Sequence, residues 1–172
     1  RVLLVSNLPY GAGTPILLGV LGLPAPPDDL VVMLQREVVE KLLAPTGGPD
    51  YGAPSVVVRL SAEGRILRRF GPEVFWPRPR VRSAVVRLTP RSEPLLAAAE
   101  RAPFGAFVTA LFTQRRKVLP TALRRALPDL DPEAVRRELA ARGLATTARV
   151  QEVEPEDLAG LWRTLAPGRP DG

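Results

Sequence analysis

Short apolar runs and amphipathic stretches alternate in the first part of the chain. Residues 1–6 and 29–34 are mostly apolar and are predicted to be buried strands. Each is followed by helical spacing, over residues 14–21 with Thr14 as the predicted N-cap, and over residues 36–43. The order strand, helix, strand, helix predicts that the two strands pair in parallel.

The next apolar segments predict a hairpin at a sheet edge. Residues 56–60 and 66–70 indicate a strand and its extension around a turn at Gly64, and residues 83–88 indicate a further strand. The Pro-rich connection 71–79 contains no predicted helix, so these strands are expected to be antiparallel.

The rest of the chain is rich in Ala, Leu and Arg at helical spacing. Asp131 is a predicted N-cap, and Gly143 is predicted to end that helix. The pattern therefore predicts an α/β fold: a mostly parallel sheet with an antiparallel edge hairpin over residues 1–91, a small all-α domain over 92–166 and a disordered tail over 167–172. Helices are predicted to begin near Pro94, Phe104, Leu119, Asp131 and Pro155.

Composition removes several kinds of chemistry. The 172 residues include no Cys and no His, which excludes thiol and imidazole catalysis and metal sites built on those side chains. The lack of Cys suits a reducing cytoplasm. The sequence also contains neither a signal peptide nor an apolar stretch of roughly 18 residues that would predict a membrane span.

The basic residues are concentrated in two segments. Lys and Arg total 24 against 18 Asp and Glu, a net charge of +6 that favours anionic partners. Nine Arg occur from Arg59 to Arg91, and five basic residues with no acid occur from Arg115 to Arg125. For any single Arg, a solvated surface position is the alternative. The candidate phosphate-binding residues are Arg78, Arg80, Arg82, Arg115, Arg116, Lys117, Arg124 and Arg125.

The loop Asn7-Leu8-Pro9-Tyr10 has the chemistry of a pocket for adenine-amine methylation. The adenine N6 amine is a weak nucleophile because its lone pair is delocalised into the ring, so acceptors for both N–H groups favour the reactive geometry. The Asn7 side-chain carbonyl and the Leu8 backbone carbonyl can accept these bonds, and Pro9 fixes the backbone beside them. Tyr10 can then stack on the base. The alternative is an ordinary strand-to-loop turn.

Two carboxylate pairs are weaker candidates for catalysis. Asp28 and Asp29 are interpreted as a loop-end helix cap, in preference to a catalytic dyad. Glu37 and Glu40 are interpreted as part of a solvated helix face. The predicted chemistry therefore depends on the loop after the first strand.

Several blocks of sequence occur in the order of a known family. They are Asn7–Tyr10 with Thr14-Pro15, Gln35–Val38, Tyr51-Gly52 before Ser55-Val56 as the entry to a sixth strand, Phe75–Val81 through Ser83–Val86, and more loosely Phe112, Arg115, Arg116, Lys117 and Leu119. Together they resemble the ribosomal RNA adenine N6-dimethyltransferase family over nearly the whole chain. Leu8 and Tyr51 favour its small-subunit branch, and the large-subunit, antibiotic-resistance branch is the alternative.

The resemblance implies the C-terminal half of a Rossmann-like class I methyltransferase sheet, followed by a helical rRNA-binding domain. It implies that Asn7 and Leu8 hold the adenine amine and that Asn7 also contacts the methyl donor, S-adenosylmethionine. Tyr10 would stack on the ring, and Phe75 would form a second aromatic wall. The implied partner is ribosomal RNA of the small subunit, bound in the cytoplasm by a monomer without metal or membrane.

Departures from the family also carry expectations. The family's Gly-rich donor loop and the acids after its second and third strands have no counterpart and would lie before Arg1. Arg82 stands where the family has Asp, and residues 11–13, Gly-Ala-Gly, are expected to loosen the loop after Tyr10. A non-catalytic RNA-binding or ribosome-assembly module is therefore the alternative from a different class of function.

Overall fold

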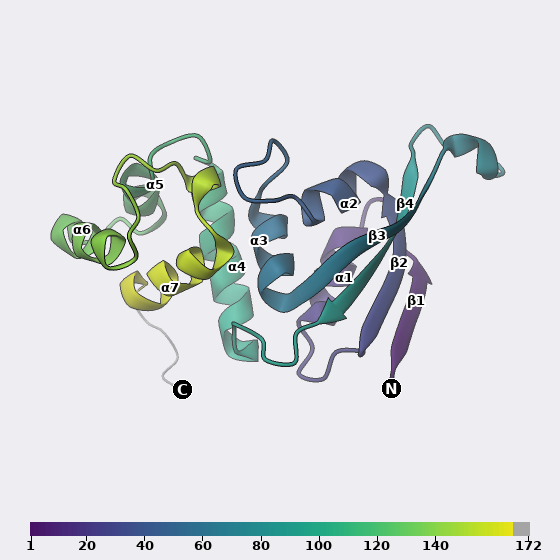
Figure 1. The fold of residues 1–172 in the computed structure, drawn as a ribbon, viewed down its shortest axis with the longest axis horizontal. Coiled ribbons are helices and arrows are strands. Elements are labelled where there is room, and N and C mark those ends of the chain that lie inside the picture. The colour runs from purple at the N-terminus through teal and green to yellow at the C-terminus, as the bar shows by residue number, and fades with distance from the viewer. Residues whose placement is uncertain (167–172) are drawn as a thin grey trace.

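The computed structural model describes residues 1–166, which form a sheet flanked by helices and a further group of helices beside it (Figure 1). The strand order is β1-β2-β4-β3. β1 pairs with β2 in parallel, and β4 runs antiparallel to both β2 and β3. The strands are β1 (Leu3–Asn7), β2 (Asp29–Gln35), β3 (Ala62–Phe70) and β4 (Ser83–Pro90).

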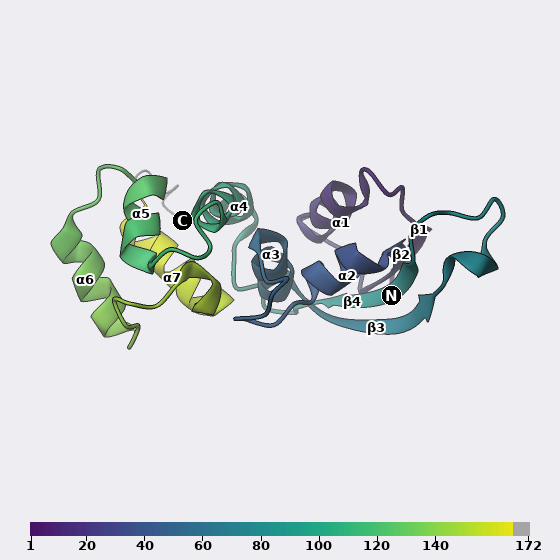
Figure 2. The same ribbon diagram turned by 90° about the horizontal axis from the view of Figure 1, so that it is seen from above.

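The first three helices lie on the same face of the sheet (Figure 2). On β2 this covered face buries Leu30, Val32 and Leu34, while Val31, Met33 and Gln35 are half-buried. No helix within residues 1–166 is both long and apolar enough to cross a membrane. The helices are α1 (Gly13–Leu21), α2 (Arg36–Leu42), α3 (Ala53–Ser61), α4 (Ala98–Phe112), α5 (Leu119–Ala126), α6 (Pro132–Ala141) and α7 (Pro155–Leu165), with 3-10 turns η1 (Pro72–Val74) and η2 (Val150–Glu152).

The predicted α/β class, with a parallel pair, an antiparallel edge hairpin and helices after it, is confirmed. Two apolar clusters form, one against the sheet and one among α4 to α7, and α3 contributes to both. Val56 and Leu60 pack into the helical cluster, whereas Val58 packs into the sheet cluster. The division at residue 91 stays a prediction, and the predicted tail lies outside the described residues.

Residues 56–60, which are predicted to be a strand, form part of helix α3 instead. The N–H of Gly52, the N-cap residue of α3, donates to Ser55 Oγ at 3.0 Å. A helix enclosed on two sides is apolar almost all round, so its sequence resembles a buried strand. Tyr51-Gly52 accordingly leads into a helix and not into the expected sixth strand.

Two predicted strand features also need correction. The first strand lies at the sheet edge and is not buried, since Val5 is 69% exposed. Gly64 lies inside β3 and not in a turn. A Cβ at Gly64 would lie 2.3 Å from Leu43 Cδ2 and 2.7 Å from Leu88 Cδ2, so close packing explains this glycine.

The helix ends differ from prediction in two places. α1 begins at Gly13 with Ala12 as its N-cap, so Thr14 lies inside the first turn. The two starts predicted near Pro94 and Phe104 are one helix, α4, with Pro103 inside it. Asp131 caps α6 by accepting from the Glu133 and Ala134 N–H groups, as predicted. Gly143 has a φ of 65° just beyond the end of that helix, which is the expected glycine stop.

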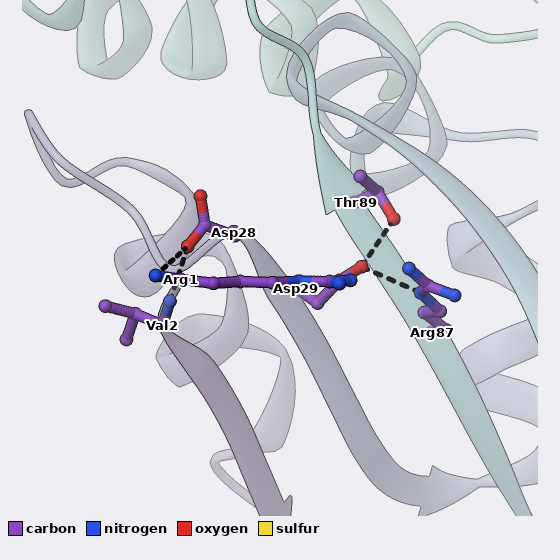
Figure 3. A network of polar contacts seen from close by, with 6 residues as sticks. All are labelled: Arg1, Val2, Asp28, Asp29, Arg87 and Thr89. Carbon is purple, nitrogen blue, oxygen red and sulfur yellow. Dashed lines mark hydrogen bonds and ion pairs between the residues drawn. The ribbon is translucent and has the colours of Figure 1, made fainter.

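Asp29 joins three segments at the amino end of β2 and is not a helix cap (Figure 3). Its carboxylate accepts from Arg87 Nε at 2.7 Å, from Thr89 Oγ1 at 2.8 Å and from the Arg1 guanidinium. The side chain is almost fully buried, and these donors, Arg87 first, hold the pKa of Asp29 well below its usual range. Asp29 therefore fastens β2 to β4 and to the start of the chain.

Replacing Asp29 with Asn is expected to destabilise the fold at pH 7. Because the folded pKa lies below the unfolded value of about 3.9, the ionised carboxylate stabilises the protein above that pH. That stabilisation is lost as the pH falls through the lower, folded pKa. Denaturant unfolding should therefore show a smaller difference in unfolding free energy between the two proteins near pH 3 than at pH 7, with part of the difference remaining near pH 3. A constant difference at both pH values would contradict this role.

Candidate functional site

The carboxyl end of β1 and the hairpin loop enclose a hollow of about 400 Å³. All five residues predicted to be catalytic line it, although Phe75 is far from the others in sequence. The loop reaches them because it connects β3 with β4, and β4 lies beside β2. The lining residues are Asn7, Leu8, Pro9, Tyr10, Phe75, Trp76, Pro77 and Pro79.

The backbone of the Asn7–Tyr10 loop is fixed while its two predicted acceptors are left free. The Leu8 N–H donates to Met33 O at 3.1 Å, and the Ala12 N–H donates to Pro9 O at 3.2 Å, which closes a turn. Within residues 1–166, neither the exposed Asn7 carboxamide nor the Leu8 carbonyl is engaged in a hydrogen bond. Both groups can accept bonds from a ligand amine.

Two aromatic rings that line the hollow each contact a side chain outside it. Tyr10 Oη lies 3.1 Å from Oγ of the buried Ser83, while 40% of Tyr10 stays exposed. The Phe75 ring meets Phe70 edge-on, with centroids 6.3 Å apart and an interplanar angle of 74°. Anchored rings that remain accessible are suited to stacking on a nucleobase. Trp76, 95% exposed, adds a third aromatic surface.

The hollow contains no acid and no cation among its eight lining residues. Its polar groups are therefore neutral acceptors and the Tyr10 hydroxyl, so no general base is built into it. Such a site can hold and polarise an amine but leaves proton removal to water.

Gly13 changes the interpretation of the glycines after Tyr10. A Cβ at Gly13 would lie 2.3 Å from Leu34 Cδ2 and 3.3 Å from Leu8 Cβ. The start of α1 therefore approaches β2 so closely that a glycine is required, and Gly13 is itself buried. The expected loosening does not apply at this position, whereas a Cβ at Gly11 would meet no other atom within 4 Å.

Comparison with known proteins shows the family of the chain. The model of the family described as ribosomal RNA adenine dimethylase matches residues 1–166. The chain belongs to this family. Among its relatives, ribosomal RNA small subunit methyltransferase A of Geobacillus thermodenitrificans is 37% identical over 96% of the chain, and that of Synechococcus sp. is 43% identical over 92%. The chain spans 57% of the length of each.

Solved structures of similar fold include a dimethyladenosine transferase from Plasmodium falciparum, with a TM-score of 0.78 and 19% identity over 94% of the chain and 65% of that protein. The 23S rRNA methyltransferase ErmE follows with a TM-score of 0.64 and 28% identity over 95% of the chain and 64% of that protein. These likenesses confirm the Rossmann-like fold of the family for the sheet.

The basic residues predicted to bind RNA in this family member fall into two separate groups. Arg78, Arg80 and Arg82 lie on the hairpin connection, and all three are exposed. The second group lies on α5 and on the connection before it, toward the opposite end of the molecule (Figure 1). One bound RNA would have to extend along the molecule to contact both. The second group comprises Arg115, Arg116, Lys117, Arg124 and Arg125.

Arg115 differs from its neighbours because it is engaged within the fold. Its guanidinium donates to Pro49 O at 2.8 Å and to Gln151 Oε1 at 3.2 Å. Arg115 thereby holds the loop before α3 against the helical part. Arg116 and Lys117 are exposed and form no ion pair within the described part of the chain. Their assignment to RNA stays a prediction.

Replacing Arg116 and Lys117 together with Gln is expected to flatten the salt dependence of RNA binding. If each contacts one phosphate, the slope of log affinity against log salt falls by about 1.4, at roughly 0.7 per phosphate of a single strand. Fluorescence anisotropy of a labelled RNA hairpin over a KCl series measures this slope. Arg137→Gln is a control, since Arg137 is exposed on α6 outside both groups. An unchanged slope would remove Arg116 and Lys117 from the interface.

Proposed function

We propose that the chain forms the acceptor side of an S-adenosylmethionine-dependent methyltransferase that dimethylates the N6 amine of adenines in small-subunit ribosomal RNA. The observation that carries this proposal is the hollow beside β1. There, in a chain of the rRNA adenine dimethylase family, the free acceptors of Asn7 and Leu8 lie beside two anchored aromatic rings.

In the proposed reaction, an adenine leaves its helix and enters between Tyr10 and Phe75. The Asn7 side-chain oxygen and the Leu8 backbone oxygen accept the two N–H bonds of the amine. This directs the nitrogen lone pair away from the ring and toward the incoming methyl group. The methylated ammonium then loses a proton to water, which fits a hollow without a carboxylate. A second cycle on the same nitrogen gives the dimethylated base.

S-adenosylmethionine would supply an electrophilic methyl group on its sulfonium sulfur, with the neutral thioether S-adenosylhomocysteine as the leaving group. Of the described residues, we assign Asn7 to the boundary between donor and acceptor, because its unpaired carboxamide lies in the hollow. The residues of the hollow fit the acceptor. Tyr10 is assigned to the base, so the proposal assigns no further donor contact within residues 1–166.

The relatives support the small subunit as the source of the substrate RNA. The names of those at 35–43% identity specify the small ribosomal subunit, whereas ErmE, at 28%, is a 23S rRNA methyltransferase. We therefore propose a small-subunit substrate and a cytoplasmic protein that acts as a monomer during ribosome assembly. The large-subunit activity is the alternative within the same chemistry.

A second candidate function is RNA binding without catalysis. It is favoured by the exposed basic residues that lie outside the hollow, namely Arg78, Arg80, Arg82, Arg116 and Lys117. In that case the exposed basic residues would still bind ribosomal RNA, and the hollow would hold an adenine without modifying it. Salt-sensitive RNA binding is common to both candidates.

Calorimetric titration of S-adenosylhomocysteine into the folded chain separates the two candidates. Micromolar binding, followed by transfer of tritiated methyl groups to adenine N6 in small-subunit RNA, would support the methyltransferase function. No heat of binding and no methyl transfer, together with retained RNA binding, would support the second candidate, RNA binding without catalysis. Nuclease digestion and chromatography of the labelled nucleosides would distinguish one methyl group from two.

A further inference from the structure

A second hollow, of about 380 Å³, lies at the same end of the sheet as the first and has the opposite chemical character. Four arginines line it, and none of its residues lines the first hollow. The lining residues are Arg36, Arg69, Arg78 and Arg82 with Phe70, Gly71, Pro72 and Glu73. We refer to it as the arginine pocket.

The sheet register brings these arginines together from distant parts of the chain. Arg36 follows β2 directly, and its backbone N–H donates to the backbone carbonyl of Arg82 at 2.9 Å. Arg69 lies near the end of β3, opposite Ala84. Arg78 comes from the connection between β3 and β4. The fold thus places four cations around one space, an arrangement that mutual repulsion opposes unless an anion is bound.

The nearby acids neutralise only part of this charge. Glu40 Oε1 lies 3.3 Å from Arg36 Nε and 4.0 Å from Arg69 Nε, and Glu73 lines the pocket itself. Arg36 Nε is buried against Glu40, but 33% of the Arg36 side chain stays exposed. A phosphate offers several oxygens that match guanidinium groups.

The hairpin connection separates the two hollows and contributes to both. Phe75, Trp76 and Pro77 line the first hollow, and Arg78, the next residue, lines the arginine pocket. A strand of RNA whose base occupies the first hollow therefore carries its charged backbone close to the second. Phosphate contacts of this kind fix the position of a nucleic acid, while base contacts specify the target.

We propose that the arginine pocket binds one backbone phosphate of the RNA strand that presents the target adenine. The proposal rests on the proposed function, and it assigns Arg36 and Arg69 to the RNA interface together with Arg78 and Arg82. It makes the pocket a positioning site, which holds the strand while the base leaves its helix. Glu40 competes with the phosphate for Arg36 and Arg69.

The test is the affinity of the full chain for a fluorescein-labelled RNA hairpin over a KCl series. Arg69→Gln and Arg82→Gln are each expected to weaken binding about tenfold and to lower the log–log slope by up to about 0.7, the value for one single-strand phosphate. Arg65→Gln is the matched control, because Arg65 is an exposed arginine on the same strand outside the pocket. It should change the affinity less than about twofold.

Glu40→Gln supplies a result of opposite sign. Removal of the competing carboxylate should strengthen RNA binding by about two- to threefold. Equal affinities and slopes for Arg69→Gln, Arg82→Gln and Arg65→Gln would overturn the arginine pocket.

A second readout keeps this test separate from that of the proposed function. The same proteins are titrated with a hairpin in which purine, which lacks the 6-amine, replaces the loop adenine. Normal slopes with a retained preference for adenine would overturn only the arginine pocket. A lowered slope in the pocket variants without any adenine preference would support the pocket and contradict the proposed function.

Discussion

Replacing Tyr10 with Ala is expected to lower methyl transfer about a hundredfold in a protein that carries the donor site, while RNA affinity falls less than about threefold. The ring offers a stacking surface of roughly 1–3 kcal/mol to a base that has left its helix. Extraction of the base costs a similar amount, so loss of the ring lowers the fraction of flipped adenine more than the overall affinity. Phosphate contacts, which supply most of the affinity, are unaffected.

Phe75→Ala is expected to behave in the same way, because Phe75 lines the other part of the same hollow. Tyr10→Phe is the matched control: it keeps the ring and removes only the hydroxyl near Ser83 Oγ. This variant should keep methyl transfer within about fivefold of the unchanged protein, since a neutral hydrogen bond contributes about 1 kcal/mol. Tritium transfer and fluorescence anisotropy measure the two quantities. Parallel losses of transfer and affinity in Tyr10→Ala would contradict the stacking role.

Replacing Asn7 with Ala is expected to lower methyl transfer by about 10²–10³, the range for loss of one preorganised polar group at a reacting centre. The Asn7 side chain forms no hydrogen bond within residues 1–166, so the fold does not depend on it. The free energy of unfolding should therefore stay within about 0.5 kcal/mol of the original value. Transfer within a factor of about two or three of the unchanged protein would exclude Asn7 from holding the amine.

The sequence predicted five of the residues that line the hollow beside β1, because most of them are close together in the chain. Asn7 to Tyr10 are contiguous, and their chemistry follows from side-chain and backbone acceptors next to an aromatic ring. Phe75 was added by family resemblance. Ser83 was missed as the partner of Tyr10, since nothing in a lone serine at the start of a strand indicates which side chain it contacts.

Contacts between residues far apart in the chain could not be predicted from the sequence for a related reason. Arg36 and Arg69 meet only through the register of β2, β4 and β3, which periodicity does not specify. Asp29 was mistaken for a helix cap because its partners Arg87 and Thr89 lie two strands later in the chain. The prediction for helix α3 was wrong for another reason. Burial on two sides removes the polar stripe that distinguishes a helix from a strand.

The central claim is that Asn7 and Leu8 recognise the N6 amine of an adenine, and a comparison of two RNA hairpins tests it most directly. One carries adenine at a single loop position, and the other carries purine, which lacks the 6-amine. The chain should prefer adenine by about two- to threefold, because a lost hydrogen bond of roughly 1–2 kcal/mol acts only on the flipped fraction of the bound RNA. The preference should weaken in Asn7→Ala, where the Leu8 carbonyl is the remaining acceptor. Equal affinity for both hairpins, or an unchanged preference in Asn7→Ala, would contradict the account.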